Sequence, residues 1–164
     1  MSQTAKRLAE LGIVLPTPAA PVANYVASVI TPGTPPNGLP QLWISGQLPL
    51  GPDGKLGERH KGKLGPDSTV DAAREAARLC ATNILAQAQA ALGDLDQVVR
   101  AVRLGGFFNV DGPFDPLPQA MNGASDLMVE VFGERGKHAR TTVGVAHLPL
   151  NALAEVEAVF LVSF

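Results

Sequence analysis

The longest periodic stretch of the chain lies between residues 70 and 91. Apolar side chains recur there every three or four positions, at Val70, Ala73, Ala77, Cys80, Ile84, Ala88 and Ala91. This spacing predicts an amphipathic α-helix whose narrow apolar side, built mostly from small residues, can lie close to a sheet. Ser68 or Thr69 is expected to cap its first turn, and Gly93 to end it.

Two further segments have helical spacing. Residues 119–132 place Ala120, Met121, Ala124, Leu127, Met128 and Val131 on one side. Residues 3–11 alternate apolar and polar side chains over a short length, and Gly12 and Pro16 would end that helix. Between the helices, residues 31–40 hold four prolines and two glycines, which predicts a loop.

Five segments have the composition of strands: residues 24–30, 41–45, 97–110, 139–148 and 154–163. Strict alternation in the third would put Val98, Arg100, Val102 and Leu104 on one side. Gly105 and Gly106 mark a bulge or a close approach within it. In the last segment Val156, Ala158, Phe160 and Val162 share one face, and Glu155, Glu157, Val159 and Leu161 share the other.

The predicted order is strand, strand, long helix, strand, helix, strand, strand. Interleaved strands and helices predict an α+β fold in a chain of 164 residues, a length that suits one domain. The last two strands are close enough in sequence to form an antiparallel pair. Residues 51–54 (Gly-Pro-Asp-Gly) predict a tight turn, because Pro52 presets φ and Gly54 tolerates a positive φ.

Charge and composition narrow the classes of function. The formal net charge is −2 and the basic residues are scattered, so nothing favours a nucleic-acid binder. A charged fraction of 17% leaves surface for subunit contacts. One cysteine excludes an intrachain disulfide. No segment reads as a signal peptide or a membrane span, so we expect a soluble cytoplasmic protein without a membrane partner.

Several familiar kinds of active site have no match in the sequence. His60, His138 and His147 lack ligand-like spacing with acidic residues, so we expect no metal. No nucleophile elbow and no phosphate-binding glycine loop is present, and we expect no cofactor.

The most specific pattern lies in the last quarter of the chain. His138-Ala-Arg140-Thr-Thr142-Val-Gly-Val-Ala-His-Leu-Pro149 is followed by Ala154-Glu-Val-Glu-Ala158. Upstream, Trp43-Ile-Ser45-Gly46-Gln-Leu-Pro49 and Asn24-Tyr25-Val26 agree with it. Together these segments resemble the RidA (YjgF) family, from about Ala23 to the C-terminus, in its longer YjgF-like subgroup.

The resemblance implies a chorismate-mutase-like fold, with a mixed sheet and two helices on one face. Residues 23–164 would form that single domain, and residues 1–22 would be an N-terminal extension. The implied assembly is a homotrimer with clefts between subunits. In the deaminase members of the family, the cleft binds a 2-imino acid or its enamine, and hydrolysis gives the 2-keto acid and ammonia.

Two residues are the candidate catalytic groups. Arg140 offers a planar guanidinium that matches a carboxylate with paired hydrogen bonds, although a surface or intersubunit ion pair is an alternative. Glu155 matches the family's water-positioning glutamate and could take a proton from that water. Glu155 and Glu157 share a face, and either could instead neutralise arginines at an interface.

The candidate substrate-binding residues are Tyr25, Ser45, Gly46, Asn122 and Thr142. Tyr25 could form a wall of the cleft or be a half-buried strand aromatic. Ser45 could donate one hydrogen bond and Gly46 could let backbone approach a ligand, or the pair is an ordinary turn. Asn122 could cap the second helix or bond across the cleft. Thr142 stands where many members have cysteine, a position that mainly offers its backbone.

Three functions remain open at this point. The first is an enamine/imine deaminase that anchors a small 2-imino or 2-keto acid through Arg140. The second is a non-catalytic sensor of carboxylic acids using the same cleft. The third is RNA cleavage, a label that some family members carry, and the missing basic surface weighs against it.

Overall fold

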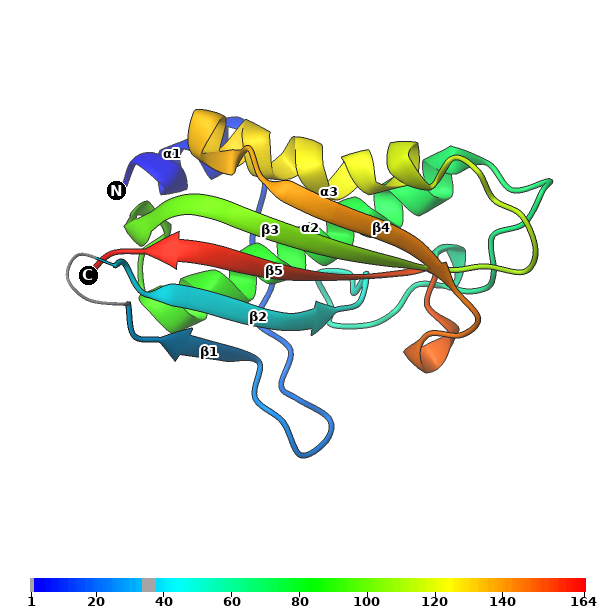
Figure 1. Ribbon diagram of the computed structural model, residues 1–164, viewed down its shortest axis with the longest axis horizontal. Coiled ribbons are helices and arrows are strands. Elements are labelled where there is room, and N and C mark those ends of the chain that lie inside the picture. The colour runs from blue at the N-terminus through cyan, green and yellow to red at the C-terminus, as the bar shows by residue number, and fades with distance from the viewer. Residues whose placement is uncertain (1, 34–37) are drawn as a thin grey trace.

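The computed structural model describes residues 2–33 and 38–164 and contains one five-stranded sheet with helices on one side (Figure 1). The elements are α1 (Gln3–Glu10), β1 (Ser28–Thr31), β2 (Gln41–Gln47), α2 (Val70–Leu92), β3 (Val98–Asn109), α3 (Leu117–Phe132), β4 (Ala139–Val145) and β5 (Ala154–Val162). Four short 3₁₀ turns join them: η1 (Glu58–His60), η2 (Leu95–Gln97), η3 (Gly133–Gly136) and η4 (Pro149–Asn151). The predicted order of elements is confirmed.

The strands lie in the order β1-β2-β5-β3-β4, and the sheet is mixed. β3 pairs with β4 in parallel, while the other neighbours pair antiparallel. α2 and α3 cover one face, and the other face turns toward the viewer in Figure 1. The α+β class and the mixed sheet with helices packed on it are therefore as predicted. No helix in the described ranges is long and apolar enough to cross a membrane.

The expected pairing of the last two strands is wrong. β4 and β5 are both hydrogen-bonded to β3, one on each side, so β3 separates them. The reason lies in the preceding connection: α3 carries the chain back across the sheet, which makes β4 parallel to β3 at the outer edge. β5 then enters between β2 and β3, at the centre of the sheet.

Small residues bring the two long helices into close contact. α2 buries Ala73, Ala76, Ala77, Cys80 and Ala81 completely. A Cβ placed on Gly123 of α3 would stand 1.9 Å from the carbonyl oxygen of Arg74. The helix backbones therefore touch at this glycine, and no larger residue fits there.

The predicted alternation along β3 is wrong in its first half. Val98, Ala101 and Leu104 are buried, whereas Arg100 and Val102 are exposed. Two register shifts in the pairing with β5 insert extra residues, so the buried positions recur every third residue. The pair Gly105–Gly106 is a close approach rather than a bulge, with side chains against both faces.

Other local predictions have mixed outcomes. The tight turn at residues 51–54 forms, with Gly54 at φ +73° and its N–H donating to the Gly51 carbonyl. Gly93 ends α2 with φ +80°. Neither expected cap holds: Thr69 occupies the N-cap position without a side-chain hydrogen bond, and the Ser68 hydroxyl accepts from Gly65 N–H.

The segment around the first predicted strand is less regular than its composition indicated. The strand begins at Ser28, and Tyr25 lies in a bend. The segment that leads into β1 projects from the body of the molecule (Figure 1). In the proline loop, residues 32–33 and 38–40 contain no helix or strand, as predicted, whereas residue 31 ends β1. Residues 34–37 of that loop lie outside the described residues.

Candidate functional site

Strand pairing decides on which face of the sheet each candidate side chain stands. Arg140 of β4 pairs with Leu104 of β3, which is fully buried beneath the helices. Side chains of paired residues point to the same face, so Arg140 stands on the helix side, at the outer edge of the sheet. Thr142 pairs with Gly106, whose Cα faces Met121 of α3, and stands on the same side.

The guanidinium of Arg140 is held by three groups on one face of α3. Nη1 donates to Asn122 Oδ1 at 2.8 Å and to Ser125 Oγ at 3.0 Å, and Nη2 donates to the Pro118 carbonyl at 3.0 Å. Residues 118, 122 and 125 are four and three positions apart, so they share one side of the helix. Asn122 lies inside α3 and does not cap it; its Oδ1 accepts from Arg140 of β4 and so positions that guanidinium. A bond from Asn122 across a cleft between chains stays a prediction.

Arg140 still has donors for a ligand. A guanidinium carries five N–H groups, and three of them are engaged with α3. Nε–H and one N–H of Nη2 donate to no residue in the described part of the chain. The side chain is exposed. Two free donors on a fixed, exposed cation are what a carboxylate requires for a paired contact.

Thr142 places a second polar group beside Arg140. Its Oγ1 is buried and has no hydrogen-bond partner among the described residues. A buried hydroxyl without a partner costs free energy, so this group has bonding capacity left for a ligand or a neighbouring chain. The expectation that this position offers mainly its backbone remains a prediction.

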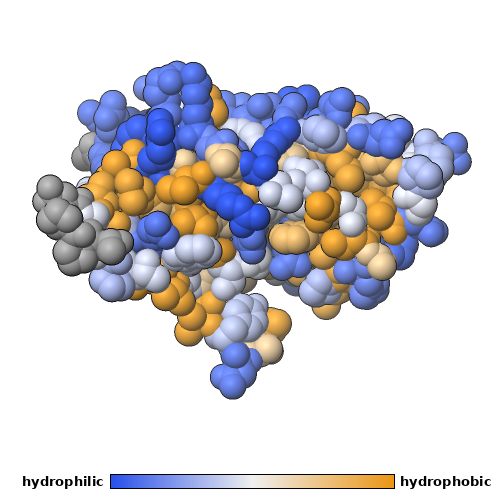
Figure 2. All heavy atoms as spheres, in the orientation of Figure 1, coloured by the Kyte–Doolittle hydropathy of each residue, from blue (hydrophilic) through white to orange (hydrophobic). Residues whose placement is uncertain are grey.

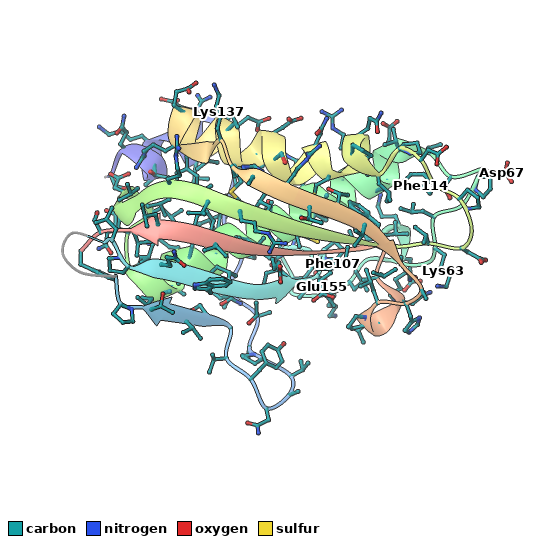
Figure 3. The ribbon with its side chains drawn as sticks, in the orientation of Figure 1. Lys63, Asp67, Phe107, Phe114, Lys137 and Glu155 are labelled. Atoms are coloured by element: carbon teal, nitrogen blue, oxygen red, sulfur yellow. The ribbon has the colours of Figure 1, made fainter. Side chains whose placement is uncertain are left out.

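The opposite, open face of the sheet carries the two glutamates, and their predicted common face is confirmed. Phe107 of β3 stands across from Glu155 of β5 (Figure 3). Two glycines make room for the carboxylates. A Cβ on Gly46 would lie 1.9 Å from Glu155 Oε1, and one on Gly105 would lie 2.6 Å from Glu157 Oε1.

The two glutamates have different surroundings. Glu157 pairs with Arg103 at 3.2 Å. Glu155 accepts a hydrogen bond from none of the described residues, and burial raises the pKa of its carboxyl, with the charge of Glu157 adding to the effect. A carboxyl with a raised pKa can exchange a proton nearer to neutral pH, as a general acid or base must.

Ser45 and Tyr25 lie beside this open face. The Ser45 hydroxyl donates to the Val26 carbonyl at 2.7 Å, and its N–H donates to the Ala27 carbonyl at 3.0 Å. The hydroxyl therefore ties the segment before β1 to β2 and has its proton in use. Tyr25 is 49% exposed and lies in a bend rather than in a strand. Its role as a wall of the cleft stays a prediction.

The candidate residues thus form two groups rather than one. Arg140, Asn122 and Thr142 are on the helix side at the β4 edge. Glu155, Gly46, Ser45 and Tyr25 are on or beside the open face. Arg140 and Glu155 project from opposite faces and from strands separated by β3. One chain alone cannot present both to the same small ligand.

Sequence reasoning missed two residues behind Arg140. His138 contacts Ser125 Oγ through Nε2 at 3.0 Å, and Ser125 also accepts from Arg140. A signal was available, because His138 is two positions before Arg140 in a strand and Ser125 is three positions after Asn122 in a helix.

The described ranges hold no group of three His, Cys, Asp or Glu side chains arranged to bind a metal ion. The absence of a metal or cofactor in the reaction stays an expectation from the sequence.

Comparison with known proteins identifies the family of this chain. The family model that matches residues 5–162 is described as "YjgF/chorismate_mutase-like, putative endoribonuclease". Protein TCP17 of Trypanosoma cruzi is 46% identical over 157 residues, which cover 95% of this chain and 92% of that protein.

Solved structures show the same fold. Atu1372 from Agrobacterium tumefaciens, a protein of unknown function, is 42% identical with a TM-score of 0.84, covering 98% of this chain and 92% of its own. A provisionally named endoribonuclease from Shewanella oneidensis is 36% identical with a TM-score of 0.88, covering 98% and 100%. Escherichia coli TdcF, solved with bound serine, is 20% identical with a TM-score of 0.60, covering 90% and 94%, and shares the fold alone.

Proposed function

Because the chain belongs to the YjgF/chorismate mutase-like family, we propose that it hydrolyses reactive 2-imino acids, or their enamine tautomers, to 2-keto acids and ammonia. The observation that carries the proposal is the state of Arg140. Its guanidinium is fixed by three hydrogen bonds to α3, is exposed, and keeps two donors free. A 2-imino acid always presents the carboxylate that such a pair of donors binds.

Glu155 supplies the proton transfers. In the proposed reaction it takes a proton from water as the water oxygen bonds to the imine carbon. It then gives that proton to the imine nitrogen, which completes a carbinolamine. As the C=O bond forms, Glu155 moves the proton of the new hydroxyl group to the amino nitrogen, and ammonia leaves. The raised pKa of Glu155 suits both steps, since the carboxyl can hold and release a proton near the working pH. Water and the imine balance the reaction without a cofactor.

The two groups act together across a subunit boundary in this proposal. Arg140 and Glu155 stand on opposite faces of one sheet, so the anchor of one copy must meet the carboxyl of another. The β4 edge, with Arg140 and Thr142, would lie against the open face of a neighbouring chain. A closed ring of three copies has three such clefts, and the homotrimer is part of the proposal.

The open face has the surface that such an assembly needs. Trp43 and Val29 are each 48% exposed there, and Val143 is 39% exposed. Figure 2 shows hydrophobic side chains gathered on this face on both sides of a hydrophilic strip. Exposed apolar surface of this kind marks contact sites between proteins.

The test is ammonia and keto-acid release from freshly generated 2-iminobutyrate or 2-aminoacrylate. The wild-type protein should accelerate release above the buffer rate. Arg140→Ala should lower kcat/KM by about 100-fold, since a lost charge-assisted, paired contact costs about 3 kcal/mol. Arg59→Ala is the matched control, because Arg59 is an exposed arginine whose ion pair with Glu75 lies outside the site; it should keep the wild-type rate.

The same experiment separates the sensor alternative. A protein that binds 2-oxobutyrate through Arg140 but leaves the imine to decay at the buffer rate would be a binding protein without catalysis. The endoribonuclease label of several relatives is tested by RNA degradation with purified protein. Degradation that persists in Arg140→Ala would assign that activity to a different site.

A further inference from the structure

A continuous chain of hydrogen bonds runs behind the carboxylate anchor. Nδ1 of His138 contacts the Gly136 carbonyl at 2.6 Å, and Nε2 contacts Ser125 Oγ at 3.0 Å. Ser125 Oγ in turn lies 3.0 Å from Arg140 Nη1. The chain therefore connects η3, α3 and β4 and ends on the cation that faces the ligand.

Hydrogen-bonding capacity fixes the direction of each bond. A carbonyl oxygen can only accept, so His138 Nδ1 carries its hydrogen toward Gly136. A neutral imidazole then has its lone pair on Nε2, and the Ser125 hydroxyl must donate to it. With that proton engaged, the lone pairs of Ser125 Oγ are turned to the donating Nη1 of Arg140. The direction follows from donor chemistry rather than from observed hydrogens.

We propose that Ser125 and His138 are positioning residues for Arg140, and that protonation of His138 tightens the binding of a 2-keto or 2-imino acid carboxylate. Neutral His138 orients Ser125, and Ser125 holds the guanidinium in place. Protonated His138 donates from Nε2 to Ser125 Oγ, which can accept from both neighbours through its two lone pairs. The contact with Arg140 therefore survives, and a second positive charge is added behind the anchor. This inference rests on the proposed function.

The charges around His138 favour such coupling. Burial lowers the pKa of His138, the hydrogen bond to Gly136 raises it, and the Arg140 charge lowers it further. Arg140 is the charged group that acts on the pKa of His138. Of the other charged side chains on the packed elements, Lys137, Arg74 and Arg78 are paired with Glu134, Asp126 and Glu130, and Arg135 donates to the Val98 carbonyl.

Linkage gives the sign of the effect. A carboxylate on Arg140 neutralises one of the charges that lower the pKa of His138, so binding raises that pKa and takes up a proton. By reciprocity, affinity for the carboxylate rises as pH falls through the pKa of His138, below its ordinary value of 6.5. Because the anchor is exposed, we expect binding to become about threefold to tenfold tighter.

The experiment is calorimetric titration of 2-oxobutyrate between about pH 8 and about pH 5. It is carried out on the full-length Glu155→Gln protein, so that the raised pKa of Glu155 does not contribute. Repeating each titration in buffers of different ionisation enthalpy measures proton uptake. We expect uptake in this parent and in His147→Gln, a control at an exposed histidine, and its loss in His138→Gln.

A second pair of variants tests the positioning step. Ser125→Ala should weaken 2-oxobutyrate binding at about pH 8 by about threefold to tenfold, and Ser125→Thr, which keeps a hydroxyl, should restore it. The histidine resonance of His138 gives a further readout, since Arg140→Ala should raise its pKa even without ligand.

The outcomes separate the two proposals. Binding that requires Arg140 but shows the same pH profile and proton uptake in His138→Gln would overturn the positioning role alone. No 2-oxobutyrate binding by the parent at any pH would remove the anchor, and with it both proposals.

Discussion

The two faces of the sheet differ in kind although the same strands build them. On the helix side, β5 presents Val156, Ala158 and Phe160, all buried, against α2. On the open side it presents Glu155 and Glu157, with glycines of neighbouring strands making room for both carboxylates. The helix-covered (closed) face is packed within one chain. The open face exposes apolar side chains and a partly buried Glu155 carboxyl.

We expect substitutions on the two faces to affect different properties of the protein. Close packing of the closed face leaves little tolerance for added volume, so changes there act on the free energy of unfolding. The open face is less constrained within one chain, so changes there should act on assembly and chemistry. Arg140 lies on the helix side but outside the packed core, because it is exposed at the outer edge of the sheet.

The largest expected effect tests the closed face. In Gly123→Ala, the new methyl group would meet backbone atoms of α2, with the Arg74 carbonyl at 1.9 Å and its carbon at 2.8 Å. Two helix backbones must separate to admit it, so we expect the free energy of unfolding to fall by about 3 kcal/mol or more. Urea denaturation followed by circular dichroism measures it, and an unchanged midpoint would contradict this packing.

The next effect tests whether the open face is an interface. Trp43→Glu would place a charge in the proposed contact, where burial of an unpaired carboxylate is costly. We expect the assembly to dissociate into folded monomers in sedimentation velocity. Val14→Glu is the control, since Val14 is 85% exposed outside the sheet. A wild-type protein that sediments as a monomer would refute the shared cleft.

A smaller change makes the contrast with Gly123 direct. In Gly46→Ala the added methyl group meets the Glu155 carboxylate, a flexible side chain end that can rotate away. We expect the free energy of unfolding to change by less than about 1 kcal/mol, while deaminase activity falls at least about tenfold because the carboxyl is displaced. The double variant Gly46→Ala/Glu155→Gln should lose little more deaminase activity than Glu155→Gln alone, because both changes act on the same carboxyl group.

The smallest effect concerns the charge of Glu155. Its pKa is raised in the folded protein, so the folded state holds that proton more tightly than the unfolded state. Stability therefore declines as pH rises from the unfolded pKa through the folded one. Glu155→Gln lacks this decline and should be more stable at neutral pH by about 0.5 kcal/mol, a figure reduced for solvent screening.

The pH dependence checks the origin of that gain. The difference in melting temperature between Glu155→Gln and wild type should vanish below about pH 4, where the carboxyl is protonated in both states. Glu58→Gln, at an exposed glutamate paired with Lys61, should show no gain. A Glu155→Gln protein less stable than wild type at neutral pH would show that the carboxylate has a stabilising partner.

Periodicity was sufficient for elements whose burial is one-sided and regular. It located α2 and α3 to within two residues, and it separated Glu155 and Glu157 from the buried face of β5. It failed in β3, where two register shifts break the alternation. It also failed for the closing strands, because strand partners depend on the path of α3 rather than on distance along the chain.

The sequence indicated individual candidate residues of the site, but not which of them contact one another or which face of the sheet each occupies. The resemblance to the family indicates Arg140, Asn122 and Glu155 as candidates, and in the structure a hydrogen bond joins Arg140 to Asn122. His138 and Ser125 escaped notice, because a bond between a strand start and a helix interior appears once both elements pack together. For Ser45, spacing leaves a ligand donor and an ordinary turn open, and the structure shows its hydroxyl donating to the Val26 carbonyl.

By itself, the sequence determined the class of fold through the spacing of apolar residues, and the family through the resemblance of its motifs. The tertiary structure alone decided that Arg140 and Glu155 point from opposite faces, because the face of each strand residue depends on which strand lies beside it. It also decided that a histidine stands behind the anchor, since the groups that join His138 to Arg140 come from separate elements.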